Sequence, residues 1–188
     1  MKTIDLDEAT LTPRIQSIIN RQLVPADIGV IFGAAGPWWL YYALLLFTGL
    51  KVVDVAMLSH WNFLPHRGIL RRFKRRSGRF SELLLPFQVV AKIPRGRLPS
   101  EPLFPTLYTD VDDSLLFEED MHRNLAEPLR FMQALLAAAD QPAASLFSLT
   151  LTNRYLLRDR DQFDPDYLDM RISIATVLEN TGGPRVLN

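Results

Sequence analysis

The amino-acid sequence predicts a mainly α protein, with an α+β fold as the alternative. It would be built on one hydrophobic helix that either spans a membrane or is deeply buried. The first observation is that the run from Ile28 to Leu50 has no charged side chain. The second is that apolar residues recur at helical spacing before and after this run. The third is a concentration of prolines between Pro86 and Pro105, which is typical of an extended connection.

These observations divide the chain into four predicted parts. Residues 1–27 would form an N-terminal amphipathic helix, and residues 28–58 a hydrophobic anchor segment. Residues 59–106 would form a basic collar and a proline-rich connection, and residues 107–188 a mostly helical C-terminal domain.

Composition limits the kinds of function that this chain can have. The sequence has 188 residues, a net charge of +0 and no cysteine. A chain of this length can bury a sizeable core. Since the molecule as a whole is neutral, attraction to a polyanion must come from a local basic patch. The lack of cysteine excludes disulfides, thiolate metal sites and cysteine nucleophiles.

The first part of the chain predicts a short amphipathic helix. Thr12 and Pro13 suit the N-cap and the first helical position. We expect the helix to end near Pro25 and to pack on the core, with docking on a membrane surface or a partner as the alternative. Its apolar side chains recur at helical spacing, as Ile15, Ile18, Ile19 and Leu23. Acidic residues stand where a signal peptide has its basic region, so we expect no signal peptide; they are Asp5, Asp7 and Glu8.

The charge-free run predicts a transmembrane helix. About 20 residues, at a rise of about 1.5 Å each, cross a hydrocarbon core of about 30 Å. Gly36 and Pro37 fall inside the run, so the helix could begin there. Lys51 and Asp54 follow it at a spacing that would let them pair. Aromatic side chains that suit a membrane interface lie within the run, as Trp38, Trp39, Tyr41 and Tyr42.

Two other interpretations of this run stay open. A helix buried in an α-rich domain would also be apolar on all sides. Alternatively, Ile28–Phe32 and Lys51–Val55 could be strands that flank a helix, with a glycine turn at Gly33 and Gly36. That arrangement resembles the Rossmann dinucleotide-binding fingerprint, which implies a pyrophosphate beside Gly33 and Gly36 and a ribose on Asp54. A tryptophan stands at the third glycine position, where the fingerprint needs a small residue.

Basic and aromatic residues interleave after the run. They predict a collar that contacts anionic lipid headgroups, at about 1 kcal/mol per basic residue near the surface. The positive-inside bias would then place the C-terminal domain in the cytoplasm. Nucleic acid is the alternative partner, with cations on phosphates and rings stacked on bases. The basic residues are Arg67, Arg71, Arg72, Lys74, Arg75, Arg76 and Arg79.

A pair of aspartates follows the proline-rich connection. The pattern Asp110-x-Asp112-x-Ser114, with a strand-like stretch ending near Thr152, resembles two motifs of haloacid-dehalogenase-like phosphatases. The resemblance implies that Asp110 is a nucleophile, that Asp112 is a general acid/base, and that both flank Mg²⁺. Prolines precede these aspartates where that family has an uninterrupted strand. The simpler interpretation is that one of the residues 112–114 caps a helix.

The C-terminal domain predicts helices. We expect two abutting helices, since Pro128 should kink or split the apolar stripe around it. Ala144–Thr152 could be a strand or a helix, and the charge cluster Arg158–Asp169 predicts a solvated loop. A last helix could begin at Asp166, before a flexible tail. The stripe consists of Leu125, Leu129, Met132, Leu135 and Leu136.

The sequence contains no complete set of catalytic residues in a known pattern. We therefore expect a non-catalytic, membrane-anchored structural or scaffolding subunit of a larger bacterial envelope assembly, of the secretion or transfer type. Its expected place is the inner membrane, with other protein subunits and anionic lipid headgroups as partners and no cofactor. The alternatives are a soluble Rossmann-like nucleotide-binding enzyme and a soluble protein-interaction module.

Overall fold

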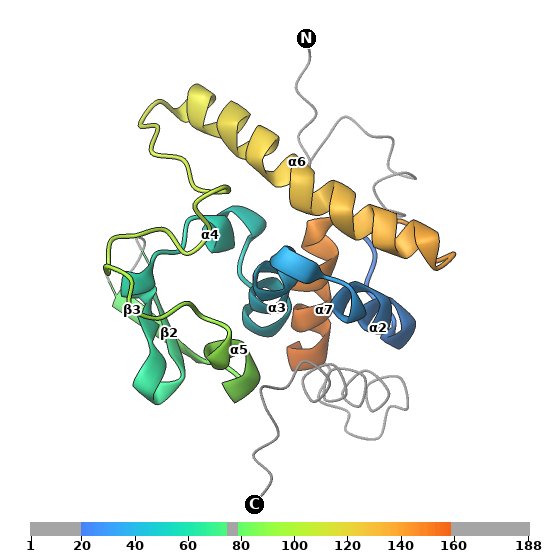
Figure 1. Ribbon diagram of the computed structural model, residues 1–188, viewed down its shortest axis with the longest axis horizontal. Coiled ribbons are helices and arrows are strands. Elements are labelled where there is room, and N and C mark those ends of the chain that lie inside the picture. The colour runs from blue at the N-terminus through green and yellow to red at the C-terminus, as the bar shows by residue number, and fades with distance from the viewer. Residues whose placement is uncertain (1–19, 75–78, 159–188) are drawn as a thin grey trace, which may run out of the picture.

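Helices make up most of the structure, which confirms the prediction of a mainly α fold. The computed structural model describes residues 20–74 and 79–158 (Figure 1). Most of the predicted N-terminal helix, Arg75 and Arg76, and the predicted loop, helix and tail after Arg158 lie outside the described residues. The described α-helices are α2 (Pro25–Gly33), α3 (Trp39–Thr48), α4 (Val52–Ala56), α5 (Phe87–Ala91), α6 (Ser114–Ala138) and α7 (Leu146–Arg158).

A small antiparallel sheet lies with α5 at one side of the helices (Figure 1). Its described strands follow the order β1 (Phe63–Leu64), β2 (Ile69–Lys74) and β3 (Arg79–Leu84). Short 3-10 helices lead into the sheet and connect its first two strands; they are η2 (His60–Asn62) and η3 (Pro65–Arg67). The sheet adds a β component to the mainly α fold.

The charge-free run is broken into pieces. It forms α2, the 3-10 helix η1 (Gly36–Trp38) and α3. Gly36 adopts a φ of 52°, which favours glycine, and Pro37 follows it, so the backbone turns between the two helices. Within the described residues no single helix is long and apolar enough to cross a membrane, and the run expected as one helix is divided at Gly36. The pair Pro25–Gly33 and Gly36–Thr48 passes that test only together, with a bend of 113°.

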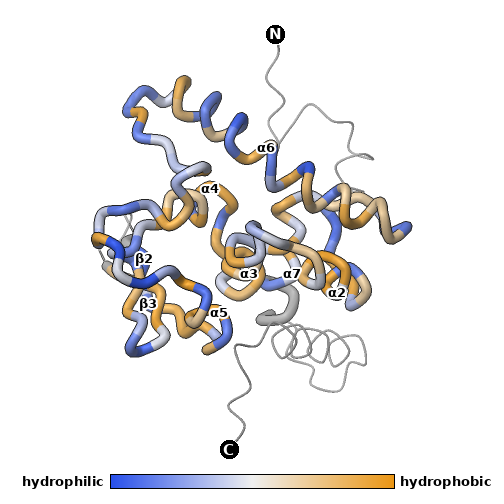
Figure 2. The backbone as a smooth tube through the Cα atoms, viewed as in Figure 1, coloured by the Kyte–Doolittle hydropathy of each residue, from blue (hydrophilic) through white to orange (hydrophobic). Residues whose placement is uncertain are grey.

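Helix α3 is the centre of the hydrophobic core. It packs along α7, while α2 lies against α6 (Figures 1 and 2). Tyr41 and Tyr42 are fully buried, and their hydroxyls donate to backbone oxygens: Tyr41 to Val52 at 3.1 Å and Tyr42 to Pro128 at 2.6 Å. The interpretation of this run as a deeply buried helix therefore fits α3, and the tyrosines in its middle serve internal hydrogen bonds.

The strand–helix–strand arrangement is absent from residues 20–74. Ile28–Phe32 lies in α2, and Val52–Val55 lies in α4. Helix α2 begins because Pro25 suits its first turn and the carboxylate of Asp27 accepts the backbone N–H of Val24 at 2.7 Å. Short apolar runs do not distinguish a strand from a buried helix, and here the helix start signals decided the outcome.

Helix α6 begins as predicted but does not divide as predicted. The side chain of Asp113 accepts the backbone N–H groups of Leu115 and Leu116, at 2.9 and 3.1 Å, which makes it the N-cap. Pro128 lies inside one continuous helix, so the prediction of two abutting helices is wrong. Apolar side chains on both sides of the proline are buried against the core, and this packing offsets the missing backbone donor. They are Met121, Leu125, Met132 and Leu136.

Helix α7 settles the open choice between strand and helix for Ala144–Thr152. The segment from Leu146 onward is helical, and Leu149 and Thr150 are fully buried. The hydroxyl of Thr150 donates to the backbone oxygen of Leu50 at 2.8 Å. The hydroxyl of Thr152 donates to Ser148 within the helix at 2.7 Å and accepts the backbone N–H of Leu23 at 2.9 Å. These hydroxyls tie α7 to Leu50, the last residue of the charge-free run, and to Leu23, which precedes α2.

Candidate functional site

The β2–β3 hairpin gathers basic residues at one end. The two strands pair antiparallel, with Lys74 opposite Arg79 at the last described register position. Arg75 and Arg76 belong to the connection between these strands and lie outside the described residues. The pairing therefore brings two predicted polyanion contacts together, and the chain adds two more between them.

Two arginines of the predicted collar, Arg71 and Arg72, make contacts within the fold. Arg72 donates to the carboxylate of Asp54 at 2.5 Å, so the predicted pairing of Asp54 with Lys51 is wrong. The guanidinium of Arg71 lies over two rings, at 4.8 Å from Phe80 and 6.0 Å from Trp61. Its Nε lies 3.8 Å from the carboxylate of Glu82, which faces Arg71 across the strand pair. Arg67, the last residue of η3, is exposed.

Large apolar side chains are exposed around the hairpin. Trp61 is 58% exposed and Phe80 is 46% exposed, although both are contacted by Arg71. Leu84 at the end of β3 and Phe87 at the start of α5 are each 79% exposed. Single exposed apolar residues are common, but neighbouring ones beside a basic hairpin form an amphipathic surface.

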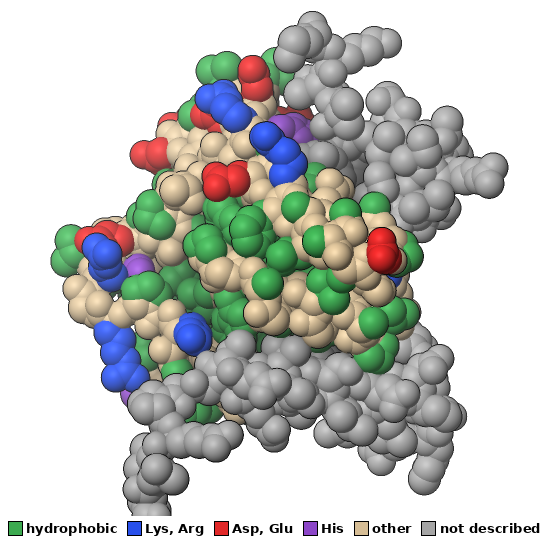
Figure 3. Space-filling model, turned by 45° about the vertical axis from the view of Figure 1, so that its right-hand side comes forward, with side chains coloured by type: hydrophobic (Ala, Val, Ile, Leu, Met, Phe, Trp, Pro, Cys, Tyr) green, Lys and Arg blue, Asp and Glu red, His purple; other side chains and the backbone are tan. Residues whose placement is uncertain are grey.

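Charge is unevenly distributed along the sequence that builds this side of the molecule. Ten lysines and arginines and one acidic residue, Glu82, lie between Ser59 and Arg97, whereas the whole chain has 21 of each sign. In Figure 3 several basic side chains lie among hydrophobic ones on the side of the sheet and α5. A neutral protein thus carries a local basic surface, here called the hairpin surface, built by the sheet, η2 and α5.

The two candidate metal ligands, Asp110 and Asp112, do not form part of a metal site in the described part of the chain. Asp110 and Asp112 are exposed in the connection that precedes α6, and no strand leads into them. No group of three or more acidic or histidine side chains among the described residues could hold a metal ion. The stretch ending in Thr152, which the phosphatase resemblance needs as a strand, is helical. The geometry gives no support to a phosphatase site.

The three candidate cofactor-binding residues also lie in a different setting from the one predicted. Gly33 is the last residue of α2 and Gly36 opens η1. Asp54 lies in α4, where it pairs with Arg72. The turn at these glycines joins two helices, so it is not the strand-to-helix turn that holds a pyrophosphate in the Rossmann fingerprint.

A groove of about 340 Å³ opens between α4, the first half of α6 and the start of α7. Its floor is mainly apolar, while Glu118 and His122 add polar groups. The predicted stripe of α6 contained two of its members, Leu125 and Leu129, but assigned both to a closed core. Sequence reasoning missed the groove because its other walls come from distant parts of the chain. The apolar lining consists of Val52, Val53, Phe117, Met121, Leu125, Leu129 and Leu146.

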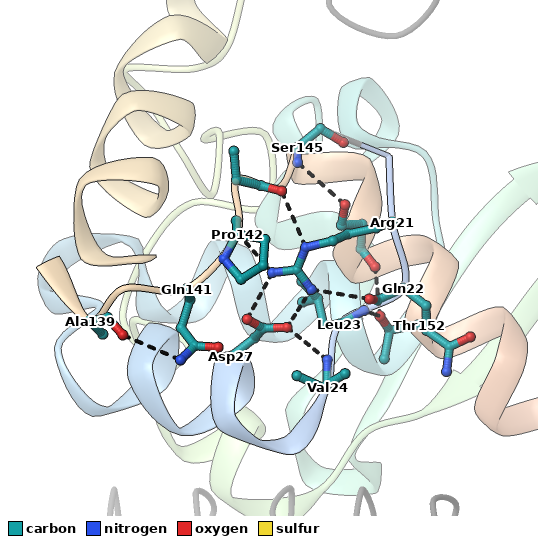
Figure 4. A network of polar contacts seen from close by, with 12 residues as sticks. Arg21, Gln22, Leu23, Val24, Asp27, Ala139, Gln141, Pro142, Ser145 and Thr152 are labelled. Atoms are coloured by element: carbon teal, nitrogen blue, oxygen red, sulfur yellow. Dashed lines mark hydrogen bonds and ion pairs between the residues drawn. The ribbon is translucent and has the colours of Figure 1, made fainter. Parts of the chain in front are cut away.

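A buried polar network fixes the chain where the described part begins (Figure 4). Arg21 makes two hydrogen bonds to the carboxylate of Asp27, at 2.6 and 2.8 Å, and Asp27 is fully buried. The same guanidinium donates to the backbone oxygens of Pro142 and Ala143, at 2.8 and 3.2 Å. This network joins residues 20–27 to the connection between α6 and α7. Both oxygens of the Asp27 carboxylate bond to Arg21, and one of them also accepts the backbone N–H of the N-cap residue of α2, which argues against a catalytic role for Asp27.

Tyr42 is the described group with a clearly shifted titration. Burial raises the pKa of its phenol well above the usual range, because the phenolate would have no water around it, and a backbone hydrogen bond at Met132 offsets only part of this effect. The hydroxyl donates to the backbone oxygen of Pro128 in α6, and Tyr42 is not among the residues that line the groove. Tyr42 is therefore a packing residue that keeps its proton.

This chain matches no protein-family model, and neither a curated protein nor a solved structure shows significant similarity to it.

Proposed function

We propose that this chain is a non-catalytic subunit of a larger bacterial envelope assembly that attaches to the cytoplasmic face of the inner membrane. The attachment uses the hairpin surface. The observation that carries the proposal is the basic end of the β2–β3 hairpin, at Lys74 and Arg79, next to the exposed ring of Phe80 in β3.

The hairpin surface has the two components that peripheral attachment requires. Each lysine or arginine near an anionic surface contributes about 1 kcal/mol. Exposed apolar side chains add to this when they enter the headgroup region, and Trp61 and Phe80 combine an apolar ring with a nearby cation. The combined affinity is modest, so a subunit of this kind would depend on an assembly that presents several such surfaces together.

The roles of the acidic residues support a non-catalytic subunit. Asp27 and Asp54 pair with arginines that hold the fold, and Asp113 caps α6. Asp120 accepts from Arg123 on the next turn of the same helix. Each of these carboxylates has a structural partner, and general acid–base catalysis instead needs a carboxylate aimed at a substrate.

Lipid headgroups fit this surface better than nucleic acid does. Base stacking needs a free ring face. The guanidinium of Arg71 lies over the rings of Phe80 and Trp61 and would compete for those faces. Insertion of ring edges among headgroups leaves this cation–π contact in place. The structure thus favours anionic lipid as the ligand of the hairpin surface.

Vesicle co-sedimentation of the full chain tests the proposal. The protein should bind phosphatidylcholine vesicles that contain phosphatidylserine, and binding should weaken with added salt. The double variant Lys74→Gln/Arg79→Gln removes about 2 kcal/mol, so its affinity should fall roughly 30-fold. Arg123→Gln/Arg130→Gln is the matched control, because it removes the same charge from exposed positions on α6 and should bind as the wild type does.

Three outcomes would contradict the proposal. The wild type could ignore the anionic lipid, or both double variants could lose affinity equally, which would show a general effect of net charge. Tighter binding to a single-stranded oligonucleotide than to the vesicles would instead identify nucleic acid as the ligand.

A further inference from the structure

The groove between α4, α6 and α7 offers a mainly apolar surface to an occupant. It is about 340 Å³ in volume, which is near the lower end of ligand clefts, and it suits a short row of aliphatic side chains. Val52 and Val53 line one wall and Met121 and Leu125 another. Contiguous apolar surface of this kind is characteristic of a site where an amphipathic helix docks.

We propose that the occupant is this chain's own segment Thr12–Ile19, which would dock in the groove as an amphipathic helix. The inference goes beyond the proposed function and is independent of it, since the groove and the hairpin surface share no residue.

The position of Asn20, the first described residue, supports this segment as the occupant of the groove. The hydroxyl of Ser145 donates to the side-chain oxygen of Asn20 at 2.5 Å. Ser145 is itself one of the residues that line the groove. The next residue, Arg21, is held by Asp27 and by two backbone oxygens of the connection before α7. The segment that precedes Asn20 therefore starts at the rim of the groove and needs no linker to reach it.

The chemistry of the segment complements the groove. Thr12 and Pro13 suit a helix start, and an eight-residue helix from Thr12 is about 12 Å long. Its isoleucines at positions 15, 18 and 19 share one face at helical spacing. Arg14 gives the segment a positive charge, and the exposed Glu118 gives the groove a negative one. Intramolecular docking would also be favoured by a high effective concentration.

Disulfide trapping in the full chain tests this occupant, because the sequence has no cysteine of its own. Ile18→Cys and, in a second protein, Ile15→Cys are each combined with Val53→Cys, a half-buried position in the groove wall. The control combines them with Leu98→Cys, which is 64% exposed and outside the groove. A disulfide needs Cα atoms within about 7 Å, so the groove pair should oxidise at least about tenfold faster, within one chain.

The products distinguish the possible occupants. A reducible monomer with faster mobility on a non-reducing gel supports the proposal. A disulfide-linked dimer would assign the groove to a second copy, and oxidation no faster than in the Leu98→Cys control would leave it to another partner. Either of the last two results overturns the proposal.

Limited trypsin digestion provides a second measurement that needs no cysteine. Cleavage after Arg14 should be at least about tenfold slower in the wild-type chain than in a free peptide of residues 9–23, since a docked helix opens before it is cut. Val53→Glu should remove most of this protection, whereas Leu115→Glu, at a 77% exposed position outside the groove, should keep it. Equal cleavage of the wild type and the peptide overturns the proposal even if Val53→Glu fails to fold.

Discussion

The ion pair between Arg21 and Asp27 provides the most direct test of how the N-terminal part is held. The substitution Arg21→Met removes the guanidinium but keeps an unbranched apolar stem of similar length. It leaves the carboxylate of Asp27, which is fully buried, without its cation. Two backbone oxygens, of Pro142 and Ala143, also lose their donor.

The expected cost follows from this geometry. Removing one partner of a buried pair leaves an uncompensated charge and costs about 3–5 kcal/mol. Arg21 is 18% exposed, so water can reach its position in the variant and the lower end of that range applies. With a urea m-value of about 2 kcal/mol per molar, the unfolding midpoint should fall by roughly 1.5 M.

A double-mutant cycle separates the ion pair from the other contacts. Asp27→Asn keeps an oxygen that can accept the backbone N–H of Val24 while it removes the charge. The double variant Arg21→Met/Asp27→Asn should therefore be more stable than Arg21→Met alone, by about 1–3 kcal/mol. A loss below about 1 kcal/mol for Arg21→Met, the value of an exposed pair, would refute the assignment of this contact as a buried ion pair.

Three further substitutions test other parts of the fold by urea unfolding. Tyr42→Phe should cost about 1 kcal/mol, since it removes a buried hydrogen bond. Above a pH of about 10 the unfolded state loses the Tyr42 proton while the native state keeps it, so the stability of the wild type should fall as the pH rises. The stability of Tyr42→Phe should fall less over the same pH range. Gly49→Ala should cost about 1–3 kcal/mol, because the φ of Gly49 is 62° and an added Cβ would lie too close to the side-chain oxygen of Asn153 in α7. Gly33→Ala is the control: an added Cβ there has no atom within 4 Å, so stability should change by less than about 0.5 kcal/mol. Asp113→Ala should cost about 1 kcal/mol as the lost N-cap of α6, and a similar cost for the exposed Asp112→Ala would show that the cap is assigned wrongly.

Local signals in the sequence were sufficient for several elements. The aspartates before Ser114 predicted a helix start, and Asp113 caps α6 through two backbone N–H groups. The spacing of Leu125, Leu129 and Met132 predicted the face that α6 buries. Both signals act within one or two helical turns, so neighbouring residues alone decide them. The sequence also predicted the basic residues at the end of the hairpin, but it did not predict the strands that carry them.

The sequence did not predict which distant residues contact one another, because such contacts depend on how separate segments pack together. Asp54 pairs with Arg72 from the sheet rather than with its sequence neighbour Lys51. The wall of the groove joins α4 to α6, and residues 20–21 bond to residues 142–145. A one-dimensional pattern cannot specify such pairings, since many arrangements satisfy the same periodicity.

The sequence by itself determined that residues 28–50 must leave water, because a run of this length without a charged side chain is too apolar to remain exposed. Only the tertiary structure decided what surrounds them. The turn at Gly36 and Pro37 folds the run back on itself. Helix α7 then packs along α3, and the backbone oxygen of Pro128 in α6 accepts the hydroxyl of Tyr42. Hydropathy measures the free energy of transfer out of water. This transfer is favourable for an apolar side chain whether lipid or protein replaces the water, which is why the sequence left that choice open.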